Sequence, residues 1–100
     1  MILRLICYDI ENDKLRNKLS KHLKIYGFTR MQKSVFCGQI TNEKWIVCKK
    51  TLTKLFELSK KESDSLYTLI INKNNFTKME IYGEAPDVEL ILDQRNVEWF

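Results

Sequence analysis

Glycine, proline and histidine are scarce in this 100-residue chain, which contains three, one and one of them. With so little glycine, the chain has no glycine-rich loop of the kind that cradles phosphate. His22 borders the apolar stripe of a predicted helix and is not placed for the acid–base work of a ribonuclease. The chain also lacks repeats, linkers and low-complexity segments, so we expect one domain.

Cysteine is infrequent as well, with Cys7, Cys37 and Cys48 far apart in sequence. No two of them have CxxC spacing, and an odd count favours reduced core thiols in a reducing compartment. A structural zinc site is disfavoured because the one histidine would have to join distant cysteines.

Long apolar runs are missing, although 44% of the residues are hydrophobic. That fraction is too high for a disordered tail, and no run is long enough to span a bilayer. The first residues lack a basic region followed by an apolar stretch and a cleavage site. We therefore expect an unprocessed cytoplasmic protein with no membrane partner.

The charge of the chain is divided unevenly along its length. Residues 1–61 carry a net charge of +9 and residues 62–100 carry −5, which gives the overall +4. A basic body with an acidic last third suits a polyanion-binding surface and a tail that meets something basic, either a partner protein or a second copy. An ordinary solvated surface remains the alternative.

The first half of the chain predicts a strand at residues 2–8, ending at Asp9, and a helix at 14–26. Leu15, Leu19, Leu23 and Tyr26 form the apolar stripe of that helix. Residues 28–40 are extended, either as one long bent strand or as two strands joined by a tight turn near residues 32–33.

The second half predicts a helix at residues 43–61, capped by residues 41–42, and a strand at 66–71. A turn at 73–75 leads to a shorter edge-like strand at 76–82, and residues 88–92 are also strand-like. The chain ends on two aromatics, Trp99 and Phe100.

This order of elements matches an α+β fold, a ferredoxin-like βαββαβ sandwich with helices on one sheet face and an additional C-terminal strand. The first strand is apolar on both faces, so the face away from the helices needs a cover. We therefore expect a homodimer joined through its sheets. Residues 1–83 would form the domain, and residues 84–100 a tail docking on the partner subunit, with 88–92 added to its sheet edge.

Asp9 is the main candidate for chemistry, because it lies between the end of a central strand and the start of a helix. Ligands in strand–helix folds gather at that edge, and a helix start suits phosphate. On the residues alone, Asp9 as a simple turn or helix cap is the stronger interpretation.

A set of spaced motifs resembles the CRISPR-associated protein 2 family. The motifs are Tyr8-Asp9-Ile10, residues 12–16, Leu19, Leu23, Tyr26-Gly27, residues 30–32, residues 34–36 and Gly38. The match runs in register from residue 2 to about residue 40. The resemblance implies a homodimer of ferredoxin-like domains that holds Mg²⁺ between the Asp9 of each subunit. It also implies capture of foreign DNA as new spacers together with a larger integrase subunit, and, in some members, metal-dependent cleavage of RNA or duplex DNA.

The resemblance also assigns roles to residues around Asp9. Arg16 and Arg30 would clamp phosphate oxygens, Tyr8 and Phe36 would be the aromatic positions, and Ser34 the polar position beside them. Each has a plain structural alternative: an ion pair on the helix for Arg16, an edge charge for Arg30, and core packing for the aromatics. Glu11 and Asp13 are nearby carboxylates that could also reach the metal, as less favoured ligands than Asp9.

Two functions from different classes follow. The first is a Mg²⁺-dependent endonuclease acting at paired Asp9 residues. The second is a non-catalytic adaptor whose basic residues grip a DNA backbone without reading its sequence. The expected nucleic-acid-binding residues are Lys14, Arg16, Lys18, Arg30, Lys33, Lys49, Lys50 and Lys54. An unrelated RNA-binding or toxin-type ribonuclease of the same fold is the fallback, and the choice between RNA and DNA is open.

Overall fold

The computed structural model describes residues 1–92, which form four strands and four helices. The elements in chain order are β1 (Ile2–Asp9), α1 (Asp13–Ile25), β2 (Thr29–Gln32), β3 (Val35–Ile40), α2 (Asn42–Phe56), β4 (Ser65–Ile70), α3 (Lys73–Thr77) and α4 (Val88–Leu92).

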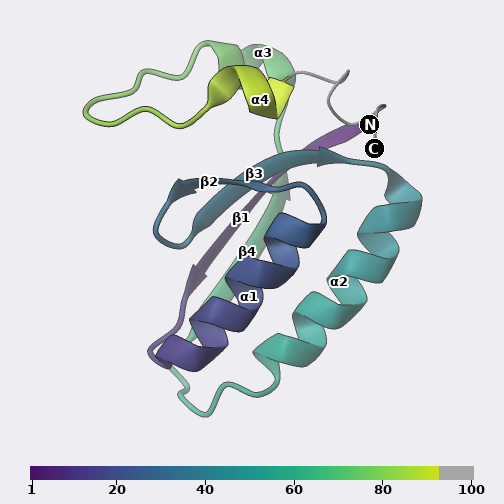
Figure 1. Ribbon diagram of the computed structural model, residues 1–100, viewed down its shortest axis with the longest axis vertical. Coiled ribbons are helices and arrows are strands. Elements are labelled where there is room, and N and C mark those ends of the chain that lie inside the picture. Colours follow the sequence, from purple (N-terminus) through teal and green to yellow (C-terminus); the bar gives the residue numbers. More distant parts are fainter. Residues whose placement is uncertain (93–100) are drawn as a thin grey trace.

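The four strands form one antiparallel sheet in the order β2-β3-β1-β4, so the first strand is central. The helices α1 and α2 lie side by side across one face of this sheet (Figure 1). The expected ferredoxin-like α+β sandwich is therefore confirmed. The opposite side of the sheet, which we call the open face, carries Leu5 and Cys7 of β1.

Both long helices begin at side-chain caps. The Asn12 side chain accepts the Leu15 N–H at the start of α1, and the Thr41 hydroxyl accepts the Lys44 N–H at the start of α2. The first helix ends before Gly27, whose φ of 86° is in the left-handed region that favours glycine. The second helix ends at Phe56, earlier than predicted, because its last turn tightens and leaves Leu58 exposed.

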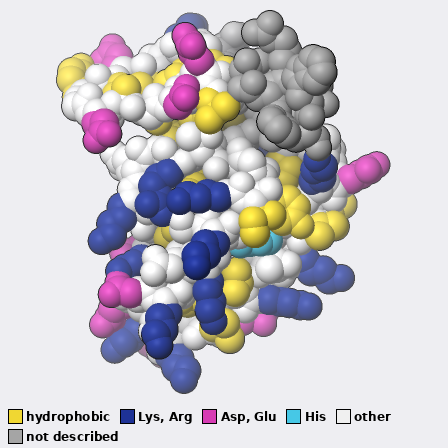
Figure 2. All heavy atoms as spheres, in the orientation of Figure 1, with side chains coloured by type: hydrophobic (Ala, Val, Ile, Leu, Met, Phe, Trp, Pro, Cys, Tyr) yellow, Lys and Arg dark blue, Asp and Glu magenta, His cyan; other side chains and the backbone are white. Residues whose placement is uncertain are grey.

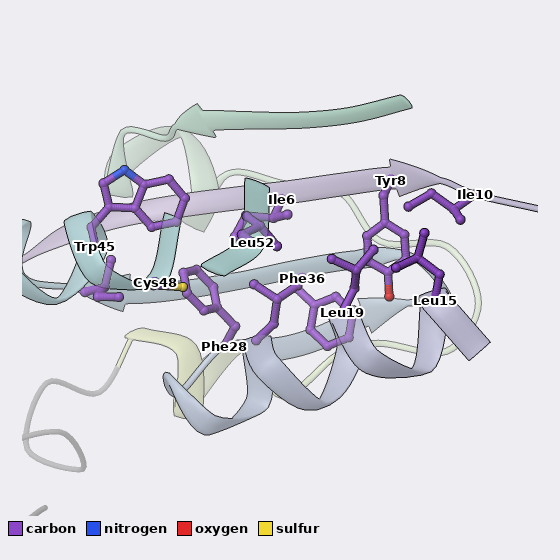
Figure 3. Close-up of a cluster of buried hydrophobic side chains, with 12 residues drawn as sticks. Ile6, Tyr8, Ile10, Leu15, Leu19, Phe28, Phe36, Trp45, Cys48 and Leu52 are labelled. Atoms are coloured by element: carbon purple, nitrogen blue, oxygen red, sulfur yellow. The ribbon is translucent and has the colours of Figure 1, made fainter. Parts of the chain in front are cut away.

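The main core fills the space between the helices and the sheet (Figure 3). Ile6, Leu19, Phe36 and Leu52 have no exposed surface, and Trp45 closes the end of the cluster opposite Ile10. Side chains of this size contribute about 1.5–3 kcal/mol each when fully buried. The stripe predicted for α1 is the stripe that packs on the sheet.

The extended segment at 28–40 is a hairpin, the second of the two alternatives. Lys33 and Ser34 form its turn, and the strand register shifts between Arg30 and Gln32. In β3, Gly38 lies close under Phe28, whose Cα would be 3.1 Å from a Cβ added at that position. Glycine therefore lets the chain after α1 cross the sheet closely.

Two predictions for the region after β4 are wrong. Residues 73–77 form helix α3, and no strand is present at 76–82; residues 88–92 form helix α4 rather than an additional strand. The Asn72 side chain accepts the Asn74 N–H and starts α3, and the Asp87 carboxylate accepts the Leu90 N–H at the start of α4. Caps of this kind favour helix over strand in short apolar segments.

These two helices cover one end of the open face. Phe76 and Ile91 are buried there in a second core cluster with Leu3 and Cys37. Figure 1 shows α3 and α4 together at this end of the molecule. The Gln39 amide also donates to the Ile91 carbonyl over 3.0 Å. Part of the cover that we expected from a second subunit therefore comes from the chain itself.

The rest of the open face has no such cover among residues 1–92. There Leu5, Cys7 and Val35 are half-buried, and Tyr67 and Leu69 of β4 are 66% and 47% exposed. Residues 93–100 of the predicted tail lie outside the described residues, so the docking of residues 84–100 on a partner stays a prediction. Within residues 1–92, no helix has the length and apolar character needed to cross a membrane.

Candidate metal and nucleic-acid site

Asp9 is the last residue of β1 and lies opposite Ser65 of β4. Because side chains alternate along a strand, Asp9 shares the open face with Leu5 and Cys7. Its side chain is exposed, in contrast to the buried Tyr8 before it. Asp9 thus stands at the rim of the uncovered apolar part of the sheet.

Tyr8 points the other way, into the core under α1 (Figure 3). Its ring stacks on Phe36 with centroids 6.2 Å apart and planes 21° from parallel. Burial raises the pKa of the Tyr8 hydroxyl, and the nearby Arg30 and Arg16 guanidinium groups partly offset that rise. The phenol is therefore neutral at ordinary pH and acts as a packed ring.

The two arginines are already engaged by the protein. Arg30 donates to the Ser20 hydroxyl over 2.6 Å, and its guanidinium lies 5.2 Å from the centroid of the Phe36 ring. Arg16 donates to the Ile10 carbonyl and forms an ion pair with Asp13. Both arginines belong to the helix side of the sheet, where Arg30 faces Phe36 in the strand register.

Ser34 is half-buried in the hairpin turn, and its backbone carbonyl accepts the Tyr8 N–H over 3.0 Å. That bond ties the hairpin to the end of β1. The six expected catalytic residues therefore divide: Tyr8, Phe36, Arg16 and Arg30 gather on the helix side, Ser34 lies in the hairpin turn, and Asp9 lies on the open face. The alternation of a strand already separates Tyr8 from Asp9, and the sequence alone could have indicated this.

The basic residues cover the helix layer. Figure 2 shows Lys and Arg side chains across the helices, whereas acidic side chains gather around α3 and α4 at the other end. The expected lysines are all exposed: Lys14 and Lys18 on α1, Lys33 in the hairpin turn, and Lys49, Lys50 and Lys54 on α2. The uneven charge along the sequence is therefore also uneven in space.

A groove of about 570 Å³ adds two lysines that the predicted set did not include. Lys14 and Lys18 line one wall, and Lys60 and Lys61, which follow α2, line another. The groove also contains the acidic side chains of Glu11 and Asp64, so its basic character is moderate. These lysines are distant in sequence, so only the fold brings the two pairs together.

The residues around Asp9 fit a magnesium ion only in part. The described residues contain no group of three or more His, Cys, Asp or Glu side chains placed to hold a metal. Magnesium prefers oxygen ligands and keeps several waters, so one or two carboxylates suffice. Asp9 supplies one exposed carboxylate, whereas the nearby carboxylates of Asp13 and Glu11 form ion pairs with Arg16 and Lys61.

The fold and these surfaces define a small ferredoxin-like α+β protein with a basic helix layer and an acidic residue at the rim of an open sheet face. Residues 1–79 match the family described as CRISPR associated protein Cas2, and the chain belongs to that family. The family match ends at α3, so α4 lies beyond it.

Curated relatives agree with this assignment. The chain is 35% identical over 86 residues to a CRISPR-associated endoribonuclease Cas2 of Synechocystis sp., covering 86% of this chain and 89% of that protein. It is 40% identical over 75 residues to one of Thermodesulfovibrio yellowstonii, covering 74% of this chain and 80% of that protein.

Solved structures agree as well. Streptococcus pyogenes Cas2 superposes with a TM-score of 0.68 at 25% identity, over 82% of this chain and all of that one. A chain of a partial Cas6-RT-Cas1–Cas2 complex superposes with a TM-score of 0.69 at 28% identity, over 88% of this chain and 98% of that one.

Proposed function

We propose that this protein acts in CRISPR adaptation as the small, dimeric subunit that binds nucleic acid beside the Cas1 integrase. Two similarities support the proposal: relatives named CRISPR-associated endoribonuclease Cas2, and a similar chain in a complex that contains Cas1. In this role two copies pack through their open faces and the basic helix layers face outward.

One observation carries the catalytic part of the proposal: Asp9 lies on the open face, next to the uncovered apolar residues that a second copy would bury. A sheet-to-sheet dimer about a two-fold axis near this rim would bring the two Asp9 carboxylates together. If the Asp9 side chain lay on the same side of the sheet as Tyr8, a dimer formed through the open faces could not bring the two Asp9 carboxylates together.

In this proposal the paired Asp9 carboxylates would hold Mg²⁺, which would supply activation of water and neutralisation of phosphate charge. The chain's other residues position the nucleic acid. Lys14 and Lys18 attract phosphates along the groove, and the Arg30–Phe36 stack keeps β2 and β3 rigid beside the end of β1. Phosphodiester hydrolysis of single-stranded RNA or duplex DNA is the reaction this arrangement would serve.

The test compares wild type with Asp9→Ala and Asp9→Asn on labelled single-stranded RNA and duplex DNA, with Mg²⁺ and with a chelator. We expect metal-dependent cleavage by wild type and none by either variant, and the preferred substrate identifies the nucleic acid. Cleavage that persists in both variants, or that ignores the chelator, would contradict the Asp9 site.

A non-catalytic adaptor is the second candidate, and the exposed lysines favour it directly. Lys49, Lys50 and Lys54 are exposed along α2, which lies on the other side of the sheet from the Asp9 side chain. Contacts of this kind with a DNA backbone need no metal and do not depend on sequence.

Charge reversal separates the adaptor from the nuclease. Replacing Lys49, Lys50 and Lys54 with Glu should weaken duplex binding and lower the slope of log affinity against log salt by about one for each phosphate that the protein no longer neutralises. Spacer capture in cells should then fail in the charge-reversed protein and persist in Asp9→Ala. The opposite pattern would favour the nuclease as the biological function.

A further inference from the structure

The backbone that follows Asp9 is held from two sides by charged side chains. Residues 10–12, which join β1 to α1 and which we call the Asp9 loop, contain the peptide groups of Ile10 and Glu11. On one side Arg16 donates to the Ile10 carbonyl over 2.8 Å and to the Glu11 carbonyl over 3.2 Å. On the other side the Asp64 carboxylate accepts the Glu11 N–H over 3.1 Å.

Asp64 is itself fixed in the turn before β4. Its second carboxylate oxygen accepts the Ser59 hydroxyl over 2.5 Å, and its N–H donates to the Lys61 carbonyl over 3.1 Å. The next residue, Ser65, is the β4 partner of Asp9 in the strand register. Asp64 therefore joins the carboxyl end of β1 to the amino end of β4 just beyond their last paired residues.

Hydrogen bonds to an ionised group are roughly twice as strong as neutral ones, and here they engage both an N–H and two carbonyls of the loop. A carboxylate accepts the loop's N–H and a guanidinium donates to the loop's carbonyls. The Lys61–Glu11 ion pair, at 3.9 Å between two exposed side chains, adds little. The two residues together restrict the direction in which Asp9 leaves the sheet.

We propose that Asp64 is a positioning residue for Asp9. Asp64 acts together with Arg16, and both act on Asp9 through the Asp9 loop. In this assignment Arg16 binds the carbonyls of the loop rather than phosphate. Asp64 holds the Asp9 carboxylate at the place where the Asp9 carboxylate of a second copy can meet it. The consequence for metal binding rests on the proposed function, whereas the clamp on the loop does not.

The first experiment measures amide hydrogen exchange in metal-free wild type, Asp64→Ala, Asp64→Asn and Glu62→Gln. Glu62 is an exposed acid in the same turn and serves as the charge-matched control. We expect faster exchange at residues 10–12 in Asp64→Ala and partial restoration in Asp64→Asn, whose amide oxygen still accepts the Glu11 N–H. Exchange in α2 should stay unchanged in every variant. Unchanged exchange at 10–12 in Asp64→Ala would overturn the clamp.

The second experiment measures Mn²⁺ affinity by calorimetry, with Asp9→Asn as the baseline. Loss of the partners that orient a metal ligand typically weakens affinity 10–100-fold, so we expect Asp64→Ala to bind at least about tenfold more weakly than wild type and Glu62→Gln to match wild type. Equal affinity in Asp64→Ala and wild type would overturn the positioning role. If wild type binds no better than Asp9→Asn, the proposed metal site fails, and the exchange experiment still decides the clamp.

Discussion

Tyr8 and Asp9 are neighbours in sequence whose side chains leave β1 on opposite sides of the sheet. Tyr8 joins Phe36 in the core, where its ring stabilises the helix layer, and Asp9 stays exposed at the rim of the open face. Tyr8→Phe should therefore change the free energy of unfolding little. Substitution of Asp9 should instead reduce metal-dependent cleavage of nucleic acid, although the two residues form one motif.

Gly38 offers a residue-scale test of the packing between the hairpin and the end of α1. A Cβ at this position would lie 3.1 Å from the Phe28 Cα, and backbone cannot move aside as a side-chain end can. We expect Gly38→Ala to lower the free energy of unfolding by about 1–3 kcal/mol. Urea denaturation measures the change, and a neutral result would show that β3 shifts freely.

Two buried thiols give the protein a pH dependence at alkaline pH. Burial raises the pKa of Cys37 and of Cys48 from 9.0 to about 11, because it disfavours the thiolate. The folded chain keeps these protons after the unfolded chain has lost them. The free energy of unfolding should therefore fall as the pH rises from about 9 to about 11.

Urea denaturation at about pH 8 and about pH 10 measures this fall in wild type and in a variant with both Cys37→Ala and Cys48→Ala. The fall should be smaller in the double variant, which loses stability at both pH values but lacks the two titrating groups. An equal fall in the two proteins would assign the effect to other groups, such as Cys7 and Tyr8, whose pKa burial also raises.

At the scale of elements, α4 is the part that the family match does not include and that the chain places on its own sheet. Ile91 is its buried residue, and its partner Cys37 has no exposed surface. The cover over this end of the open face therefore depends in part on a helix of only five residues. Such a helix has little stability apart from its packing.

Ile91→Asp should detach α4 and expose Cys37 to a thiol reagent while Cys48, in the main core, stays protected. The expected result is one additional reactive thiol, identified by mass spectrometry of the labelled protein. Leu90→Asp is the matched control, because Leu90 is exposed on the same helix. Protection of Cys37 in the Ile91 variant would show that α3 alone covers it.

The predictions from sequence succeeded where the deciding contacts are local. The Leu15, Leu19 and Leu23 stripe predicted a helix at 14–26, and the structure places α1 at Asp13–Ile25. They failed at 76–82 and 88–92, where short apolar segments resemble strands. The caps at Asn72 and Asp87 and the burial of Phe76 and Ile91 beside Leu3 favour the helices α3 and α4. Asp64 was missed as well, because the residue it holds is 53 positions away.

At the scale of the whole molecule, the extents of 38, 33 and 19 Å describe a thin plate, with α1 and α2 on the side opposite the open face. We expect two plates to pack through their open faces, so Leu69→Asp, opposite Leu5 in the sheet, should yield a monomer. Analytical ultracentrifugation measures the mass. Ile46→Asp, exposed on α2, should leave the dimer intact, and a dimeric Leu69 variant would contradict the proposed interface.

The central place of β1 also has a consequence for the order in which the protein assembles during synthesis. β1 is made first, yet its neighbours are β3 and β4, and β4 begins only at Ser65. Pairing over such a separation is slow, because a long loop must close before the contacts form. A nascent chain can build β1, α1, β2 and β3 into a unit, while the edge beside Asp9 waits for the last strand. The candidate site is therefore incomplete in any translation product that stops before β4, because such a chain contains Asp9 but lacks its β4 partner Ser65.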